Sequence, residues 1–185
     1  MNISLSTEQN REIFDGILCK SRNFDILKRE IVFAGRKAVL YMIDGFEKED
    51  LLEKILESFY RLAPEDAATE DMFRRAHIPY SSLSTEKDVD KIVTHILSGK
   101  TALMAEGFEN AFIMELRTYP QRDTAEPDRD KVMRGSRDGF TEGLTLNAAL
   151  IRRRIRDRNL SVEYHSVGKV SKTDAAICYL ADRAD

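Results

Sequence analysis

Two hydrophobic patterns run along the chain, period-two alternation and helical spacing, and together they predict a mixture of strands and helices. Residues 24–43 contain two strand-like runs, "FDILKREIVFA" and "AVLYMID", joined at "GRK", which predict a β-hairpin. In residues 47–62, apolar side chains recur every three or four positions behind an acidic first turn, which predicts an amphipathic helix. The first part of the chain is therefore predicted to be a helix laid on a small sheet.

A proline at position 64 opens a second, shorter helical stretch that ends near residue 77. The following residues, "IPYSSLST", are expected to be extended, because the residue before a proline is disfavoured in the α region. We place a domain boundary here. The sequence thus predicts a first subdomain over residues 1–80 and a second over 81–185.

The second part opens with a predicted helix over residues 86–97, for which Ser84 or Thr85 is a candidate cap and Gly99 a candidate end. Further on, two apolar runs flank "EGFEN", a helix is predicted from "DGF" to "RRRIRD", and two strands end the chain. The phrase "TALMAEGF" is similar to the earlier "AVLYMIDGF", which leaves a repeated α/β unit open. The predicted fold class is mixed α/β (α+β), with two small α/β subdomains, each a small mixed sheet packed with helices.

Composition and charge fit a folded protein with an unremarkable surface. The chain is 42% hydrophobic and 33% charged, with 29 basic and 32 acidic residues and a net charge of -3, so anion binding requires a local cluster. The longest purely apolar run, "AVLYMI", is far shorter than the roughly 20 residues of a membrane span, and the chain as given is expected to be soluble. Cys19 and Cys178 are far apart in the sequence and are expected to be reduced, buried or half-buried thiols.

Seven arginines lie between Arg134 and Arg158 and are the strongest candidates for a functional site. On a helical wheel, one apolar stripe faces the core, formed by Phe140, Leu144, Ala148, Ile151 and Ile155. The arginines of "RRRIR" spread over more than half of the circumference, whereas a helix that follows a nucleic-acid groove would gather them on one side. Nucleic acid is therefore not a predicted partner.

Arg154 flanks the apolar stripe and is expected to be sheltered and paired with a carboxylate, as is Arg137, whereas Arg152, Arg153 and Arg156 are expected to be more exposed. We interpret these arginines as part of a structural or interfacial ion network. The candidate carboxylate partners are Asp138, Glu142, Asp157 and Asp174. Two alternatives stay open: solvated charges favoured by the helix dipole, and an anion site at Arg134, Arg137 and the backbone near Gly135 and Gly139. The candidate interaction residues are Arg134, Arg137, Asp138, Glu142, Arg152, Arg153, Arg154 and Arg156.

Enzyme motifs fail when they are compared residue by residue. In "GSRDG" the serine directly follows the first glycine, so the strained nucleophile turn G-x-S-x-G is not formed. "VGKVSKT" has a valine after Gly168-Lys169 and Glu163 where the first glycine of a phosphate loop belongs. His77, His95 and His165 are solitary. The sequence therefore predicts no catalytic residues, no metal site, no cofactor and no enzymatic activity.

Three segments resemble one known family: "SGKTALMAEGFENAFIMELRTYPQR", "EPDRDKVMRGSRDGFTEGLTLNAALIRRRIRD" and "VGKVSKTDAAICYLADRAD". They are similar to the N-terminal soluble region of the GerA-type spore germination proteins, and this resemblance covers residues 98–185. The first half, notably "FAGRKAVLYMIDGFEKEDLLEKIL", is more similar to the branch of stage V sporulation protein AF than to germinant receptor A subunits.

The resemblance implies an N-terminal regulatory or assembly domain of a spore inner-membrane protein, lying on the cytoplasmic or core side and followed by a multi-span region outside this chain. It implies other subunits of a germination complex as partners, a homo-oligomeric receptor or ion-conducting assembly, and no catalytic chemistry. Alternatives that remain are the ligand-sensing domain of a germinant receptor A subunit and a cytosolic domain that binds a small anion. The sequence identifies no small-molecule ligand.

Overall fold

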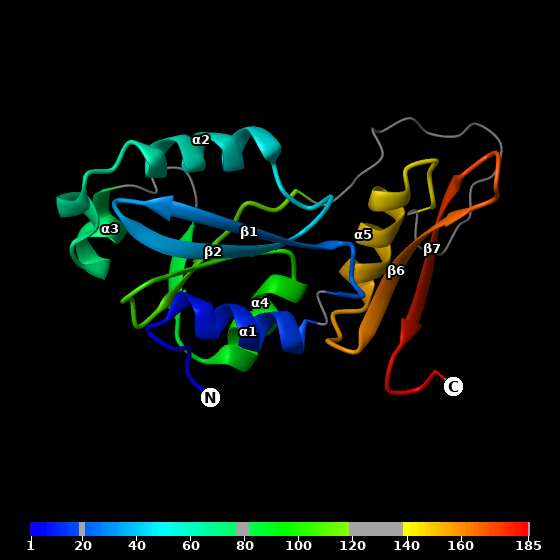
Figure 1. The fold of residues 1–185 in the computed structure, drawn as a ribbon, viewed down its shortest axis with the longest axis horizontal. Helices are drawn as coiled ribbons and strands as arrows, with labels where there is room; N and C mark the ends of the chain where they lie inside the picture. The colour runs from blue at the N-terminus through cyan, green and yellow to red at the C-terminus, as the bar shows by residue number, and fades with distance from the viewer. Residues whose placement is uncertain (19–20, 77–81, 119–138, 185) are drawn as a thin grey trace, which may run out of the picture.

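The structure is a computed structural model that describes residues 1–18, 21–76, 82–118 and 139–184, and it is built from two sheets and the helices around them (Figure 1). In chain order, the elements are α1 (Thr7–Ile17), β1 (Ile26–Phe33), β2 (Arg36–Ile43), α2 (Glu49–Tyr60), the 3-10 turn η1 (Pro64–Ala67), α3 (Glu70–Ala76), β3 (Leu83–Glu86), α4 (Val89–Leu97), β4 (Thr101–Ala105), β5 (Ala111–Met114), α5 (Leu144–Arg154), β6 (Leu160–Val167) and β7 (Thr173–Leu180). The predicted mixed α/β class is confirmed.

The larger sheet has five antiparallel strands in the order β1-β2-β4-β5-β3. Strands β2 and β4 pair in its centre, with Ala38 opposite Ala105 and Leu40 opposite Leu103. The sheet therefore combines strands from both sides of the boundary predicted at residues 80–81. The physical reason lies in the burial of β2 and β4: both strands are buried on both faces and need a partner along each edge. The second sheet is the hairpin β6-β7 alone.

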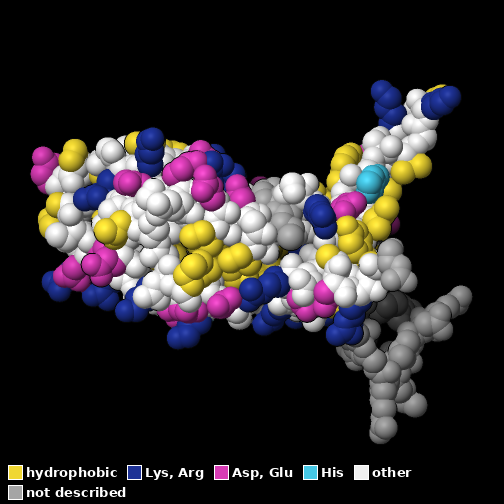
Figure 2. All heavy atoms as spheres, turned by 60° about the horizontal axis from the view of Figure 1, so that its bottom comes forward, with side chains coloured by type: hydrophobic (Ala, Val, Ile, Leu, Met, Phe, Trp, Pro, Cys, Tyr) yellow, Lys and Arg dark blue, Asp and Glu magenta, His cyan; other side chains and the backbone are white. Residues whose placement is uncertain are grey.

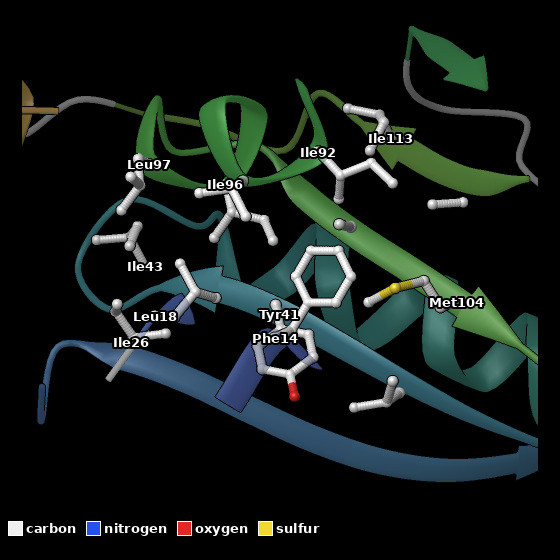
Figure 3. Close-up of a cluster of buried hydrophobic side chains, with 14 of the residues drawn as sticks. Phe14, Leu18, Ile26, Tyr41, Ile43, Ile92, Ile96, Leu97, Met104 and Ile113 are labelled. Atoms are coloured by element: carbon white, nitrogen blue, oxygen red, sulfur yellow. The ribbon is translucent and has the colours of Figure 1, made fainter. Parts of the chain in front are cut away.

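Helices cover both faces of the larger sheet. Helices α1 and α4 lie on one face, where Phe14, Tyr41 and Ile96 belong to one buried cluster (Figures 1 and 3). Helices α2 and α3 lie on the other face, over a cluster of five phenylalanines whose ring centroids are 4.9 to 5.8 Å apart: Phe33, Phe59, Phe73, Phe108 and Phe112. The larger sheet is consequently the middle layer of three.

The first hairpin, α2 and the two later strand pairs lie where the hydrophobic pattern predicted them. The start of α4 differs from the prediction. Its N-cap is Asp88, whose carboxylate accepts the N–H of Lys91 at 3.1 Å, whereas Ser84 and Thr85 lie in the edge strand β3 and pair with β5. Serine and threonine occur both as helix caps and in edge strands. Here the pairing with β5, which lies far away in the sequence, places Ser84 and Thr85 in a strand.

The two similar phrases of the sequence form the same kind of turn. Gly45 and Gly107 both have left-handed backbone, with φ of 81° and 79°, and the following phenylalanine donates its N–H to the carbonyl three residues earlier, at 3.3 and 3.1 Å. Phe46 and Phe108, however, pack into the clusters on opposite faces of the sheet. One turn leads toward a helix and the other toward a strand, so the similarity describes a turn and not a repeated unit.

Helix α5 lies between the larger sheet and the hairpin β6-β7 (Figure 1). Ala149 belongs to the cluster beneath the larger sheet, whereas Ala148 packs with Leu160 and Val162 of the hairpin. The predicted apolar stripe is therefore only partly correct. Phe140 lies before the helix and Ile155 after it, and their exposed fractions are 67% and 40%.

Cys178 is an exposed free thiol, contrary to the expected burial, and Cys19 lies outside the described residues. Among the residues that are described, no helix has the length and apolar character needed to cross a membrane.

Candidate functional site

The candidate site is centred on Arg152, the largest fully buried side chain of the described residues. Its Nε donates to Asp25 Oδ2 at 2.8 Å and its Nη2 to Asp25 Oδ1 at 3.1 Å. Neither side chain of this pair has any exposed area. The planar guanidinium thus holds the carboxylate through two parallel hydrogen bonds, the geometry in which arginine pairs most strongly.

The other N–H groups of Arg152 also bind protein atoms. Nη1 donates to the carbonyls of Leu160 at 3.2 Å and Asp157 at 3.4 Å, and Nη2 donates to Asn23 Oδ1 at 3.5 Å. A guanidinium has five N–H donors, so this one has none left for a ligand. We call Arg152, Asp25 and Asn23 the buried clamp.

Asn23 extends the clamp to two further elements. Its Nδ2 donates to the carbonyl of Leu18, at the end of α1, and its Oδ1 accepts the N–H of Val162 in β6, at 2.7 and 2.8 Å. The N–H of Phe24 in turn donates to the carbonyl of Val162 at 3.1 Å. The buried clamp therefore joins α1, the segment before β1, α5 and β6, at the place where the hairpin meets the larger sheet.

The predicted burial of Arg152 and Arg154 was wrong. Arg154 was expected to be sheltered and Arg152 exposed, and the structure shows the reverse. Arg154 and Arg156 are exposed and Arg153 is half-buried, whereas Arg152 is buried. The wheel assumed one core-facing side for a helix beginning at Phe140. In the structure α5 is covered on two sides, and Arg152, one turn after Ala148, lies on the side that faces β6.

The remaining predicted residues are placed as follows. Arg134, Arg137 and Asp138 lie outside the described residues, and Glu142 is exposed ahead of α5. Among the proposed carboxylates, Asp157 serves Arg152 through its backbone carbonyl, and its side chain accepts the N–H of Asn159. Asp174 accepts the hydroxyl of Tyr164 at 2.5 Å. The carboxylate that pairs with Arg152 is Asp25, which the sequence reasoning missed, although an acidic residue directly before an apolar strand was a usable signal.

A half-buried carboxylate, that of Glu47, lies on the loop between β2 and α2. A side chain at Gly45 of this loop would touch Ala149 at 3.3 Å, so the loop packs against α5. Oε1 of Glu47 is buried and has no hydrogen-bond partner within the described part of the chain. Burial, together with the nearby carboxylates of Asp44 and Glu49, raises the pKa of Glu47 to about 7.

This raised pKa predicts a pH-dependent stability. A carboxyl whose folded pKa lies above its unfolded value of about 4.5 stabilises the fold fully below that unfolded value, and its contribution is lost as the pH rises through about 7. We expect urea unfolding to give a free energy about 1–3 kcal/mol lower at pH 8 than at pH 5 from this group. Glu47→Gln should remove that difference, whereas Glu57→Gln, on an exposed part of α2, should preserve it. An unchanged pH dependence in Glu47→Gln would assign the loss to other groups.

The described residues offer little for metal or anion binding. Within residues 1–18, 21–76, 82–118 and 139–184, no group of three or more histidine, cysteine or acidic side chains could hold a metal ion. A groove between α1 and the first hairpin is lined by Arg11 and Arg36 among others. Arg36 donates to the carbonyls of Ala67, Ala68 and Glu106, and Arg11 pairs with Glu8. These guanidiniums are thus committed to protein partners.

The fold is shared with a domain whose crystal structure is known. It matches the crystal structure of the N-terminal domain of the A subunit of the Bacillus megaterium spore germinant receptor GerK3, with a TM-score of 0.78 and 16% sequence identity. The match covers all of this chain and 68% of that one. At this identity, the comparison establishes the shared fold.

The sequence comparison then establishes the family. Residues 14–185 match the model of the Bacillus/Clostridium GerA spore germination protein family, and the chain belongs to that family. The resemblance found in residues 98–185 is therefore confirmed, and it extends through nearly the whole first half.

Three of the relatives come from Bacillus subtilis. Stage V sporulation protein AF is 34% identical over 181 residues, which cover 96% of this chain and 36% of that protein. Spore germination protein B1 is 32% identical over 155 residues, covering 80% of this chain and 31% of the relative. Spore germination protein KA is 35% identical over 108 residues, covering 58% of this chain and 20% of the relative. The chain thus spans about a third or less of the length of these relatives.

Proposed function

We propose that this chain is the N-terminal regulatory or assembly domain of a longer protein that acts in spore germination. The observation that carries the proposal is the family match over residues 14–185, which includes both sheets and the buried clamp. The similarity to stage V sporulation protein AF over 96% of this chain supports the choice of that branch. An enzymatic role is not proposed, because in the part of the chain that the structure describes Arg152 at the candidate site and Arg36 in the groove donate to protein atoms.

The buried clamp gives this domain a rigid junction. By fixing α5 and β6 to the larger sheet, it holds the exposed Arg154 and Arg156 in one place relative to the rest of the domain. A surface of fixed shape and charge suits recognition by a neighbouring subunit better than a mobile segment does. We therefore propose that this end of α5 contributes to assembly with other subunits of a germination complex, including further copies of the same protein.

The intact protein is proposed to reside in the spore inner membrane, with this domain on the cytoplasmic or core side. We propose that a region outside this chain attaches the intact protein to the membrane. A further relative in Bacillus subtilis, 28% identical over 163 residues, is described as the membrane protein YfkQ, which supports attachment of the intact protein to a membrane.

Germination of spores tests the proposal. We expect Arg154→Ala combined with Arg156→Ala, in the intact protein, to slow the nutrient-induced fall in optical density several-fold while the protein stays abundant. Arg61→Ala, an exposed arginine at the end of α2, is the matched control and should leave germination unchanged. Normal germination after complete deletion of the gene would overturn the germination role. Normal germination of the double variant alone would overturn only the assembly surface.

Sensing of a germinant is the second candidate function. It is favoured by the shared fold with a domain of a germinant receptor A subunit and by the similarity to germination proteins B1 and KA. Thermal melting of the chain against a panel of amino acids, sugars and nucleosides separates the two roles. A saturable rise in melting temperature with one compound would favour sensing over assembly.

A further inference from the structure

The hairpin β6-β7 extends away from the rest of the described chain (Figures 1 and 2). Its inner end is buried at Leu160, Ser161 and Val162, and every β6 residue from Tyr164 outward is exposed. The paired register runs to Val167 opposite Thr173, so residues 168–172 form the connecting turn. Basic side chains lie at its outer end (Figure 2).

The end of this hairpin combines exposed apolar and basic side chains. Val170 is 96% exposed and Val167 is 56% exposed, although both are β-branched apolar residues. Lys169 and Lys172 accompany them, and residues 165–173 contain no aspartate or glutamate. We call residues 165–173 the hairpin tip. In a chain with a net charge of -3, this tip is a locally cationic, apolar point.

The stability of the domain does not account for this composition. The hairpin is held at its inner end by the buried clamp and the small cluster of Ala148, Leu160 and Val162, far along the strands from the tip. A valine with 96% exposure adds no buried apolar area to the fold. The apolar residues of the tip are therefore available to an outside partner.

The shape and charge of the tip select the partner. A stable protein–protein contact buries about 800 Å² on each side, which a narrow five-residue turn does not offer. A narrow, convex turn can, in contrast, insert its apolar side chains into the interface of a bilayer. Lysines beside these side chains then lie at the level of the anionic headgroups.

We propose that the hairpin tip contacts an anionic lipid bilayer, inserting Val167 and Val170 at the interface while Lys169 and Lys172 bind the headgroups. The proposal rests on the membrane placement given under the proposed function, and it adds a second membrane contact that belongs to this chain. Each lysine should strengthen binding to an anionic surface about fivefold, so the tip alone binds weakly and acts on a protein already held near the membrane.

The chain contains no tryptophan, which makes the test direct. Val170→Trp places a single indole at the tip, and Met72→Trp, at a 46% exposed position on α3, is the matched control. Both chains carry a C-terminal histidine tag that holds them on vesicles containing nickel-chelating lipid. The vesicles are otherwise phosphatidylcholine, with or without 30% phosphatidylglycerol. Circular dichroism verifies the fold of each variant.

We expect the emission of Val170→Trp to shift to shorter wavelength on the phosphatidylglycerol vesicles, and the control to keep its emission. Adding Lys169→Glu and Lys172→Glu should abolish the shift and weaken flotation of the untagged chain with the same vesicles at least 25-fold, at about fivefold per lysine. An unshifted Val170→Trp on all vesicles would overturn the proposal, as would a shift without vesicles that depends on protein concentration, which would identify a second copy as the partner. Because the readout involves no spores, a failed germination role would leave a positive result intact.

Discussion

Replacing Arg152 with alanine should lower the free energy of unfolding by about 3–5 kcal/mol, the largest single effect expected in this domain. The substitution leaves the carboxylate of Asp25 buried, with no exposed area and without its bidentate partner. It also removes the donors to the carbonyls of Leu160 and Asp157. Urea unfolding monitored by circular dichroism measures the loss.

Two comparisons make this result interpretable. Arg154→Ala removes the same side chain from an exposed position two residues away and should cost less than about 1 kcal/mol. The double variant Arg152→Met with Asp25→Leu removes both charges together and should recover a large part of the loss, because a buried apolar pair needs no counter-charge. Equal and small losses for Arg152→Ala and Arg154→Ala would show that the buried clamp contributes no more than an exposed arginine does.

The local elements of this fold were predictable from the sequence, because their determinants lie within them. The first hairpin has its two apolar runs and its turn within residues 24–43, and α2 has its apolar stripe and acidic first turn within one stretch. The pairing of β2 with β4 was not predictable in this way. It joins residues more than sixty positions apart, and its only sequence signal is the near-continuous apolar character of both strands.

In the candidate site, too, the local features were predictable from the sequence and the long-range contacts were not. The sequence predicted that an arginine of α5 would be sheltered and paired, and the structure contains such a pair. Choosing Arg152 over Arg154 required knowing that the hairpin β6-β7 folds back over α5 and buries a second side of it. Asp25 lies 127 residues away, and its position directly before an apolar strand marked it as a sheltered carboxylate without identifying its partner. Helical periodicity describes how one face of a helix packs, and α5 has two such faces.

Asn23→Ala tests whether the buried clamp acts as one unit, and it should lower the free energy of unfolding by about 2–4 kcal/mol. The asparagine is 1% exposed, and its loss leaves the carbonyl of Leu18 and the N–H of Val162 without their hydrogen bonds in a buried place. Buried polar groups without partners cost about 1–3 kcal/mol each. The matched control is Asn147→Ala, which removes hydrogen bonds to the backbone of Thr141 in an exposed loop and should cost less than about 1 kcal/mol.

Hydrogen exchange distinguishes a local defect from a loosened junction. If Asn23 holds the hairpin to the larger sheet, the amides of β6 and β7 should exchange at least tenfold faster in Asn23→Ala, while those of β2 and β4 change only with the global stability. Equal acceleration in both sheets would mean that the domain opens as a single unit and that the clamp has no separate role at the junction. Faster exchange confined to the hairpin would show that the orientation of β6 and β7 is fixed by three buried polar side chains, because the hairpin's own core is small.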